Sequence, residues 1–301
     1  MDNSQDLDKS QDTRQKIMTD LQTWIRQNRS TGVESYFDEG DQPEVIPETA
    51  AALEVAVAVP EAAAQVKAPT TEEPSAFSIA CDQFVAEALS AIASHDAVRA
   101  EDDALLAEHG GDGVAAMAAL QVIVDPCTAC DLSASRTKTV FGVGNPAAEV
   151  VFIGEAPGEA EDRQGEPFVG ASGQLLTKIL GAIGFARQDV YICNILKCRP
   201  PNNRDPLPAE VAQCEVHLKR QLALLRPRVI CCLGRVAAQT LLKTDLSLGK
   251  LRNTVHFYEG VPVMATFHPA ALLRNPKWKR DTWDDVRKLK ALSEALGSKR
   301  I

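Results

Sequence analysis

The sequence predicts an α/β fold of three layers, α/β/α, with a mostly parallel central sheet and a largely disordered acidic N-terminal arm before it. Two observations predict this fold. Short apolar runs alternate with helical patterns over the C-terminal part of the chain, as they do in parallel sheets. The charge also divides the chain, because residues 1–115 hold 7 Lys/Arg and 23 Asp/Glu while residues 116–301 hold 25 and 18.

The two parts therefore carry net charges of −16 and +7, against −9 for the whole chain. A basic body favours a polyanionic partner. An ordinary solvated surface is the alternative, since a charge of +7 on a domain of this size does not identify a partner.

The N-terminal arm divides into two segments ahead of a catalytic domain at 114–301. Within residues 1–37, the apolar side chains Ile17, Leu21 and Trp24 recur at helical spacing and predict an amphipathic helix. Residues 38–113 are rich in Ala, Glu, Pro and Val and predict a mostly disordered linker, with one helix at 76–106. The first helix either docks a protein partner or caps the body.

In the body, apolar runs predict strands and amphipathic runs predict helices, in alternation. The expected strands are 150–153, 190–193, 229–233 and 261–266, and the expected helices are 172–183, 208–225, 236–242 and 278–296. Ligands bind such sheets where strands end and loops begin, and the polar motifs of this chain all follow predicted strands.

The eight cysteines indicate a metal centre rather than disulfides. The first thirty residues are polar and charged, so no secretory signal is expected, and the apolar run at 50–66 is too short and too polar to span a bilayer. We therefore expect a soluble, cytoplasmic protein with no membrane contact.

Four of these cysteines have the spacing of metal ligands. Cys127 and Cys130 form a C-x2-C pair, and fifteen residues separate Cys198 from Cys214. Four thiolates suit either a [4Fe–4S] cluster or a structural zinc, and the spacing does not choose between them. Cys193, Cys231 and Cys232 fall in predicted core strands, and Cys81 falls in the linker.

Three polar segments each follow a predicted strand. The first, GEAPGEAED, begins at Gly154 and is followed by GEPFVGASGQLL from Gly165; the second is NILKCRPPNNR from Asn194; the third is FHPAALLRNP from Phe267. In this order, with the cysteines between them, they resemble the family 4 uracil-DNA glycosylases over about residues 124–292. The resemblance implies a compact α/β/α domain with a structural [4Fe–4S] cluster on Cys127, Cys130, Cys198 and Cys214.

The resemblance also implies roles for the pocket residues. Phe168 would stack on the flipped uracil, and the Asn194 amide would pair with its O4 and N3–H, which cytosine cannot match. His268 would donate a hydrogen bond to uracil O2 as negative charge develops there.

The residue that activates water is less directly implied. Ala156 stands where better-known uracil glycosylases have an aspartate, so the neighbouring Glu155 is expected to act as base or to hold Asn194. Gly158 replaces the tyrosine that excludes thymine, and Glu161 is expected to take over that work. The pocket wall would also include Gly154.

DNA binding is expected from loops around the pocket. The helix start at Ser172 and Gly173 is a phosphate site, and Leu272, Leu273 and Arg274 would enter the gap left by the flipped base. Phosphate contacts are also expected from Arg199, Arg204, Lys277, Lys279 and Arg280, although a solvated surface would equally explain each of these alone.

The predicted function is hydrolysis of the N-glycosidic bond of deoxyuridine in single- or double-stranded DNA, by a monofunctional, monomeric, nucleoid-associated repair enzyme. One alternative is a glycosylase with broader deaminated-base specificity. Another, from a different class, is a non-catalytic iron–sulfur DNA-binding module of the replication or repair machinery.

Overall fold

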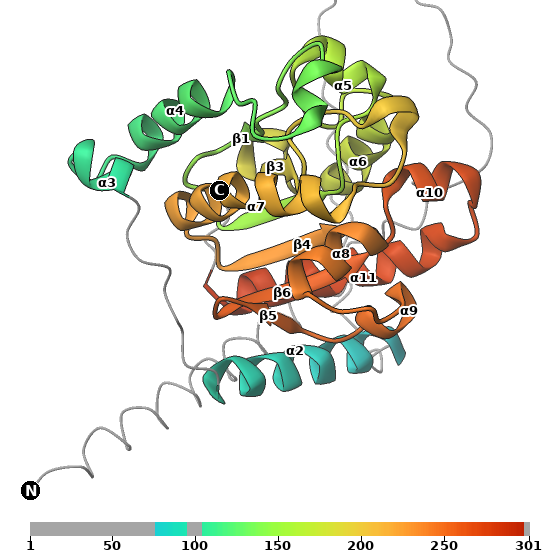
Figure 1. Cartoon of the computed structure of the whole chain (residues 1–301). Helices are drawn as coiled ribbons and strands as arrows, with labels where there is room; N and C mark the ends of the chain where they lie inside the picture. The colour runs from blue at the N-terminus through green and yellow to red at the C-terminus, as the bar shows by residue number, and fades with distance from the viewer. Residues whose placement is uncertain (1–75, 95–103, 298–301) are drawn as a thin grey trace, which may run out of the picture.

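The structure is a computed structural model and describes residues 76–94 and 104–297 (Figure 1). The predicted N-terminal amphipathic helix and most of the predicted linker lie outside the described residues. The segment predicted to dock a protein partner is therefore also outside them.

A six-stranded sheet forms the middle of the molecule. In chain order its strands are β1 (Val143–Gly144), β2 (Val150–Gly154), β3 (Tyr191–Asn194), β4 (Val229–Leu233), β5 (His256–Tyr258) and β6 (Val261–Thr266). Their order in space is β1-β3-β2-β4-β6-β5. The four central strands are parallel, and β1 and β5 pair antiparallel at the edges. Every residue of β2, β3 and β4 is buried, which explains why their sequences, apart from Asn194 at the end of β3, are apolar rather than alternating.

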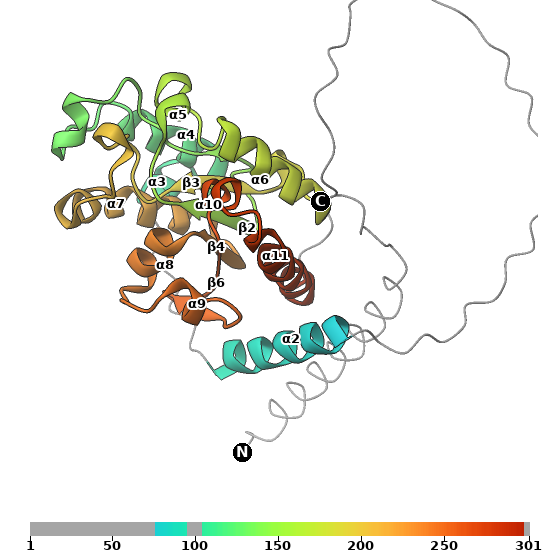
Figure 2. The same ribbon diagram turned by 90° about the vertical axis from the view of Figure 1, so that its right-hand side faces the viewer.

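Helices cover both faces of this sheet. In chain order they are α2 (Ala76–Ser94), α3 (Ala104–Glu108), α4 (Gly113–Val124), α5 (Glu159–Gln164), α6 (Ala171–Ala182), α7 (Pro208–Leu225), α8 (Arg235–Leu242), α9 (Leu248–Leu251), α10 (Pro269–Arg274) and α11 (Trp278–Ala295). Buried side chains of α4, α7 and α8 share one core with the sheet, and those of α2, α6 and α11 share the other. Figure 2 shows the sheet between α7 and α8 on one side and α6 and α11 on the other. The predicted α/β/α class is confirmed.

The sequence located the central elements better than the peripheral ones. The predicted bounds of α7, β4 and β6 are those observed. The helix predicted over 76–106 is wrong in extent, because α2 ends at Ser94 and α3 begins separately at Ala104. The sequence does not predict the edge strands β1 and β5, since strands of two or three residues are too short to show periodicity.

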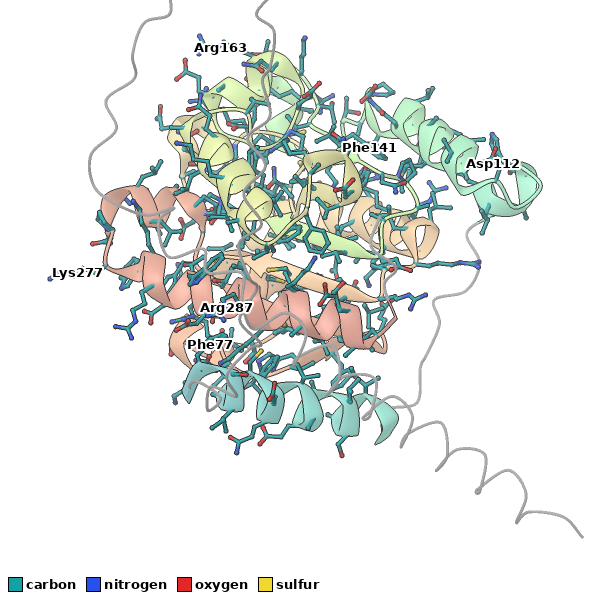
Figure 3. All side chains as sticks on the ribbon, turned by 180° about the vertical axis from the view of Figure 1, so that it is seen from behind. Phe77, Asp112, Phe141, Arg163, Lys277 and Arg287 are labelled. Carbon is teal, nitrogen blue, oxygen red and sulfur yellow. The ribbon has the colours of Figure 1, made fainter. Side chains whose placement is uncertain are left out.

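Helix α2 packs against the body, although it falls within the predicted linker. Phe84, Val85 and Ala88 are buried in the core that includes α11. The Arg287 guanidinium of α11 lies 3.6 Å from the centroid of the Phe77 ring, and Figure 3 shows the two residues meeting between the helices. Within the described parts of the chain, no helix is long and apolar enough to cross a membrane.

Candidate active site

The polar motifs converge at the carboxyl edge of the sheet. Gly154 ends β2, Asn194 ends β3, Gly234 follows β4, and His268 lies two residues beyond β6. Strands β2 and β4 are neighbours in the sheet. The chain leaves β2 toward β3 on one side of this pair, and it leaves β4 toward β6 on the other side. Such a switch point is where open α/β sheets bind ligands.

Phe168 is held over this edge in a rare backbone conformation. Its φ is +54°, in the left-handed region that a bulky residue seldom adopts. The Glu161 carboxylate accepts hydrogen bonds from the next two amides, Val169 N at 2.9 Å and Gly170 N at 3.0 Å. Gly173 allows a close backbone approach, because a Cβ there would lie 1.7 Å from the Phe168 carbonyl oxygen. The loop is therefore fixed from both sides, as functional backbone strain requires.

Asn194 presents an unpaired buried acceptor at the end of β3. The residue is 2% exposed, and its Oδ1 atom has no hydrogen-bond partner among the described residues. Its backbone carbonyl accepts from the buried Lys197 Nζ at 2.8 Å. Leaving a buried carbonyl oxygen unpaired costs about 1–3 kcal/mol, so a donor supplied by a ligand would be favourable at this atom.

Gly154 makes room for both side chains. A Cβ at this position would lie 2.3 Å from Asn194 Oδ1 and 2.7 Å from Phe168 Cζ. Only glycine therefore permits the amide and the aromatic ring to approach the end of β2 together.

His268 faces Phe168, with ring centroids 5.4 Å apart. It is the N-cap of α10, and its Nδ1 accepts the Ala270 N–H at 3.1 Å. Burial, with a smaller effect from Arg274, lowers the pKa of His268 to about 4, although Glu161 opposes the shift. The imidazole is therefore neutral at physiological pH, and because Nδ1 is an acceptor, its proton lies on Nε2.

A buried ion pair that the sequence did not predict holds the segment before His268. Asp285 accepts from Thr266 Oγ1 at 2.6 Å and from Arg252 Nε at 2.7 Å. Thr266 ends β6, and the Arg252 guanidinium lies 4.5 Å from the Phe267 ring centroid. No sequence signal could have joined these residues, because 33 positions separate Arg252 from Asp285.

Two of the four carboxylates in the first motif, those of Glu155 and Glu161, lie in different settings. Glu155 is half-buried, and burial raises its pKa; the Asp205 carboxylate raises it further and Arg235 lowers it. Ala156 packs beside the cysteines rather than offering any polar group. Glu161 is committed to the Phe168 loop, and its Oε2 occupies the space above Gly158, 2.7 Å from where a Cβ would stand.

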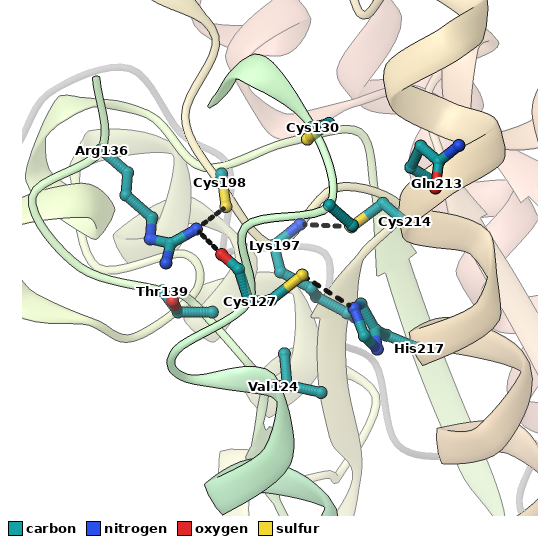
Figure 4. A pocket seen from close by; sticks show the side chains of 11 residues that line it. Val124, Cys127, Cys130, Arg136, Thr139, Lys197, Cys198, Gln213, Cys214 and His217 are labelled. Carbon is teal, nitrogen blue, oxygen red and sulfur yellow. Dashed lines mark hydrogen bonds between the residues drawn. The ribbon is translucent and has the colours of Figure 1, made fainter. Parts of the chain in front are cut away.

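The four predicted metal-ligand cysteines line one pocket. Figure 4 shows Cys127 and Cys130 on the loop after α4, Cys198 after β3, and Cys214 on α7, around a pocket that His217 and Arg136 also line. Cys198 and Cys214 are buried. Burial raises the pKa of the Cys214 thiol to about 11, so a bound cation is needed to make it a thiolate at neutral pH.

Hydrogen-bond donors approach three of these sulfurs. The Arg136 guanidinium is 3.3 Å from Cys198 Sγ, the Lys197 backbone N–H is 3.3 Å from Cys214 Sγ, and His217 Nε2 is 3.3 Å from Cys127 Sγ. Arg136 also bonds the Cys127 carbonyl at 2.6 Å. Donors around thiolates are typical of iron–sulfur sites. In the described ranges, no three His, Cys, Asp or Glu side chains form a group that could hold a single metal ion.

His217 and Arg136 were missed from the sequence, although a signal existed for one of them. His217 follows Cys214 by three positions on the same helix, so both side chains project from one face. Arg136 lies on an irregular segment, where spacing carries no such information.

The predicted DNA-binding residues fall into different environments. Ser172 and Gly173 lie in the first turn of α6, where Ser172 is half-buried and Gly173 is packed under Phe168. Leu272 is 1% exposed and packs in a core with α6 and α11, so it is not available to DNA. Leu273 and Arg274 are exposed, Leu273 by 49%.

Two of the predicted phosphate contacts are engaged elsewhere. Arg204 pairs through both terminal nitrogens with Glu210, at 2.9 and 2.5 Å. Arg199 bonds Asn203 at 2.8 Å and lies 3.8 Å from Glu159. Lys277 and Arg280 are exposed, and Lys279 is half-buried.

Comparison with known proteins bears on the same region. A family model described as "UDG: Uracil DNA glycosylase superfamily" matches residues 141–287. The type-4 uracil-DNA glycosylase of Archaeoglobus fulgidus is 50% identical over 54% of this chain and 86% of its own length. That of Thermotoga maritima is 44% identical over 58% of this chain and 93% of its own, and that of Saccharolobus solfataricus is 44% identical over 59% and 85%. The chain belongs to the type-4 uracil-DNA glycosylase family.

Proposed function

We propose that this protein removes uracil from DNA by hydrolysing the N-glycosidic bond of a flipped deoxyuridine, leaving an abasic site. The observation that carries the proposal is the unpaired, buried Asn194 Oδ1, which lies with the Phe168 ring over Gly154, while His268 faces the same ring. A base in this position would be stacked on one face and hydrogen-bonded at its edge, as enzymes acting on extruded bases require.

Recognition of uracil follows from the asymmetry of the Asn194 amide. Oδ1 accepts the N3–H of uracil, and the Nδ2 group donates to O4. Cytosine has an acceptor at N3 and an amino donor on C4. Its N3 would face the Asn194 Oδ1 acceptor and its amino group would face the Nδ2 donor, so neither pair could form a hydrogen bond. Rejection of roughly 10⁴-fold is typical where a buried polar group would be left unpaired.

His268 stabilises the leaving group. As the C1′–N1 bond breaks, its electron pair passes to the uracil ring, and charge develops on O2. The neutral imidazole donates Nε2–H to that oxygen, because the Ala270 amide holds Nδ1 as the acceptor. A donor fixed in advance contributes about 10²–10³ in rate.

Glu155 receives the proton of the attacking water. Its position at the end of β2 and its raised pKa suit a base that works near neutral pH. Water adds to C1′ on the face opposite the departing base and passes its proton to the carboxylate.

Strand cleavage through an imine is not part of the reaction. The buried Lys197 lies beside the pocket, but its Nζ donates to the Asn194 carbonyl at 2.8 Å. Its role is to orient β3, which supports a monofunctional glycosylase.

We infer that Cys127, Cys130, Cys198 and Cys214 hold a structural [4Fe–4S] cluster. Two observations support it: the four cysteines line one pocket, and a nitrogen atom lies within hydrogen-bond distance of three of their sulfurs. When bound, the cluster cross-links the loop after α4 to β3 and α7.

Contacts with single- or double-stranded DNA are assigned to the first turn of α6, including Ser172, and to Leu273 and Arg274. Of the two adjacent leucines, Leu273 rather than Leu272 can fill the gap left by the flipped base, because Leu272 is buried. We expect the enzyme to act as a monomer on the nucleoid.

Separating binding from cleavage tests the proposal against a non-catalytic DNA-binding module. The His268→Ala and Asn194→Ala proteins should lose uracil release, by at least 10²-fold, while keeping affinity for uracil-free DNA within about threefold. Equal loss of binding and cleavage in both variants, with unchanged thermal unfolding, would show that the role assignment is wrong.

A further inference from the structure

The segment that joins α10 to α11 exposes a tryptophan among cations. Residues 273–278 are all exposed, and Trp278 is 38% exposed. Between residues 268 and 280 there is no Asp or Glu. The cations of this stretch are Arg274, Lys277, Lys279 and Arg280. Figure 3 shows Lys277 projecting outward at this corner of the molecule.

The Trp278 ring is fixed rather than free to rotate. It stacks on Phe267 with centroids 4.8 Å apart and an interplanar angle of 8°. The Phe267 ring is also contacted by the Arg252 guanidinium, which the buried Asp285 carboxylate binds at 2.7 Å. Rigid aromatic surface is an efficient contact, because little conformational entropy is lost when a ligand covers it.

The same contacts connect this ring to the proposed active site. Phe267 directly precedes His268, and the turn between the helices is closed by the hydrogen bonds Asn275 N to Ala271 O and Trp278 N to Asn275 O. The exposed Leu273 lies on α10 between them. The tryptophan is therefore held in a fixed relation to the histidine.

We propose that Trp278 is a stacking platform for an unpaired base of the DNA strand, close to the flipped uridine. The inference rests on the proposed function, because that function brings the strand past His268. Base–aromatic stacking contributes about 5- to 100-fold in affinity per base (1–3 kcal/mol, at 1.4 kcal/mol per tenfold) and tolerates any sequence. The four cations bind the phosphates on either side.

An unpaired base fits this surface better than a paired one. In a duplex both faces of each base are covered by its neighbours, whereas a single strand can present one face to a side chain. The platform thus gives the enzyme an affinity for single-stranded or locally opened DNA that the uracil pocket alone does not supply.

A purely structural role for Trp278, as a cover for Phe267, makes a different prediction. Leucine would still cover Phe267 but has no π face, whereas phenylalanine keeps both properties. The pair Trp278→Leu and Trp278→Phe therefore separates stacking from packing, and thermal unfolding of both proteins monitors the packing.

The experiment measures binding of the full-length, iron-loaded protein to a fluorescent single-stranded oligonucleotide with one 2′-fluorinated deoxyuridine, which resists hydrolysis. Matched oligonucleotides carry a tetrahydrofuran abasic unit at each of the four positions on either side. We expect Trp278→Leu to weaken binding to the intact strand by about 5- to 100-fold and Trp278→Phe by less than threefold. At one abasic position the leucine and wild-type proteins should bind equally.

A Trp278→Leu penalty that is the same at every abasic position, or no penalty at all, would overturn the platform. Uracil release from an ordinary deoxyuridine strand by the same wild-type preparation reports on the proposed function separately. If the Trp278 effect on binding depends on no single base while uracil release is intact, the platform is wrong and the proposed function stands. If uracil release is absent, the proposed function itself is wrong.

Discussion

Two titratable side chains at the carboxyl edge of the sheet are shifted from their ordinary pKa values in the same sense, toward the neutral form. Burial is the largest cause in both, and it raises the pKa of Glu155 and lowers that of His268 to about 4. For the histidine, neutrality is what the proposed hydrogen bond to O2 requires. For the glutamate, a higher pKa makes a better proton acceptor near pH 7.

The raised pKa of Glu155 predicts how activity depends on pH, and substitutions of two neighbouring charged residues should shift that dependence in opposite directions. Activity needs the ionised carboxylate, so uracil release should fall as pH drops through the raised pKa of Glu155. Asp205 raises that pKa and Arg235 lowers it. Asp205→Asn should therefore move the acidic limb of the kcat/KM profile to lower pH, and Arg235→Ala should move it to higher pH. If neither substitution moves the limb, Glu155 is not the group that titrates.

Helix α6 and the loop before it form a unit whose glycines have different tasks. Gly173 is packed against the Phe168 carbonyl, while a Cβ at Gly181 in the same helix would meet nothing within 4 Å. Gly173→Ala must displace the Phe168 loop and should lower kcat/KM by more than tenfold. Gly181→Ala should leave activity unchanged and raise the free energy of unfolding by about 0.5–1 kcal/mol. Equal effects of the two substitutions on kcat/KM would contradict this view of the loop.

Helix α10 carries a buried leucine, Leu272, and an exposed leucine, Leu273, which is the proposed DNA contact. Leu272→Ala should lower the free energy of unfolding by about 2–5 kcal/mol, because it opens a cavity beside Ile179 and Val286. Leu273→Ala should change it by less than about 0.5 kcal/mol and lower kcat/KM on duplex DNA more than on single strands. Urea unfolding and steady-state kinetics measure the two effects. If Leu273→Ala lowered kcat/KM more on single strands than on duplex DNA, Leu273 would not be the residue that fills the gap left by the flipped base.

The central strands could be predicted from the sequence, but the contacts that support them could not. Strands buried on both faces read as apolar runs, and the polar motifs follow those strands directly, so the positions of Asn194 and His268 at the carboxyl edge of the sheet were predictable. The sequence predicts DNA contacts for both Leu272 and Leu273. Which of these two leucines faces solvent depends on how the short helix α10 packs against the body, and local sequence does not encode that. The Asp285–Arg252 pair and the stack on Phe267 depend on contacts distant in sequence, which no local pattern encodes.

At the scale of the whole molecule, the four cysteines proposed as cluster ligands lie where three separate segments of the chain meet. They come from the loop after α4, the end of β3 and helix α7. Arg136 reinforces the same junction, since it bonds the Cys127 carbonyl, the Asp125 carbonyl and Cys198 Sγ. The bound cluster should therefore stabilise one end of the molecule rather than take part in the reaction.

This role predicts how the cluster is lost. Arg136→Ala should release iron several-fold faster in air than the wild type, measured as the decay of visible absorbance and as iron per protein. Arg163→Ala is the matched control, because Arg163 is exposed and its ion pair among the described residues is with the exposed Glu159, at 3.7 Å. Identical iron retention in the two variants would contradict a stabilising role for Arg136.

The central claim is that the site formed by Phe168, Asn194 and His268 excises uracil, and direct detection of the free base tests it. The wild-type protein, purified anaerobically, is mixed in excess with strands that carry a single uracil, cytosine or thymine at one position. We predict release of uracil with alkali-labile cleavage at that position, and no release of cytosine or thymine. Tight binding of the uracil strand by an iron-loaded sample, without free uracil or an abasic site, would contradict the account.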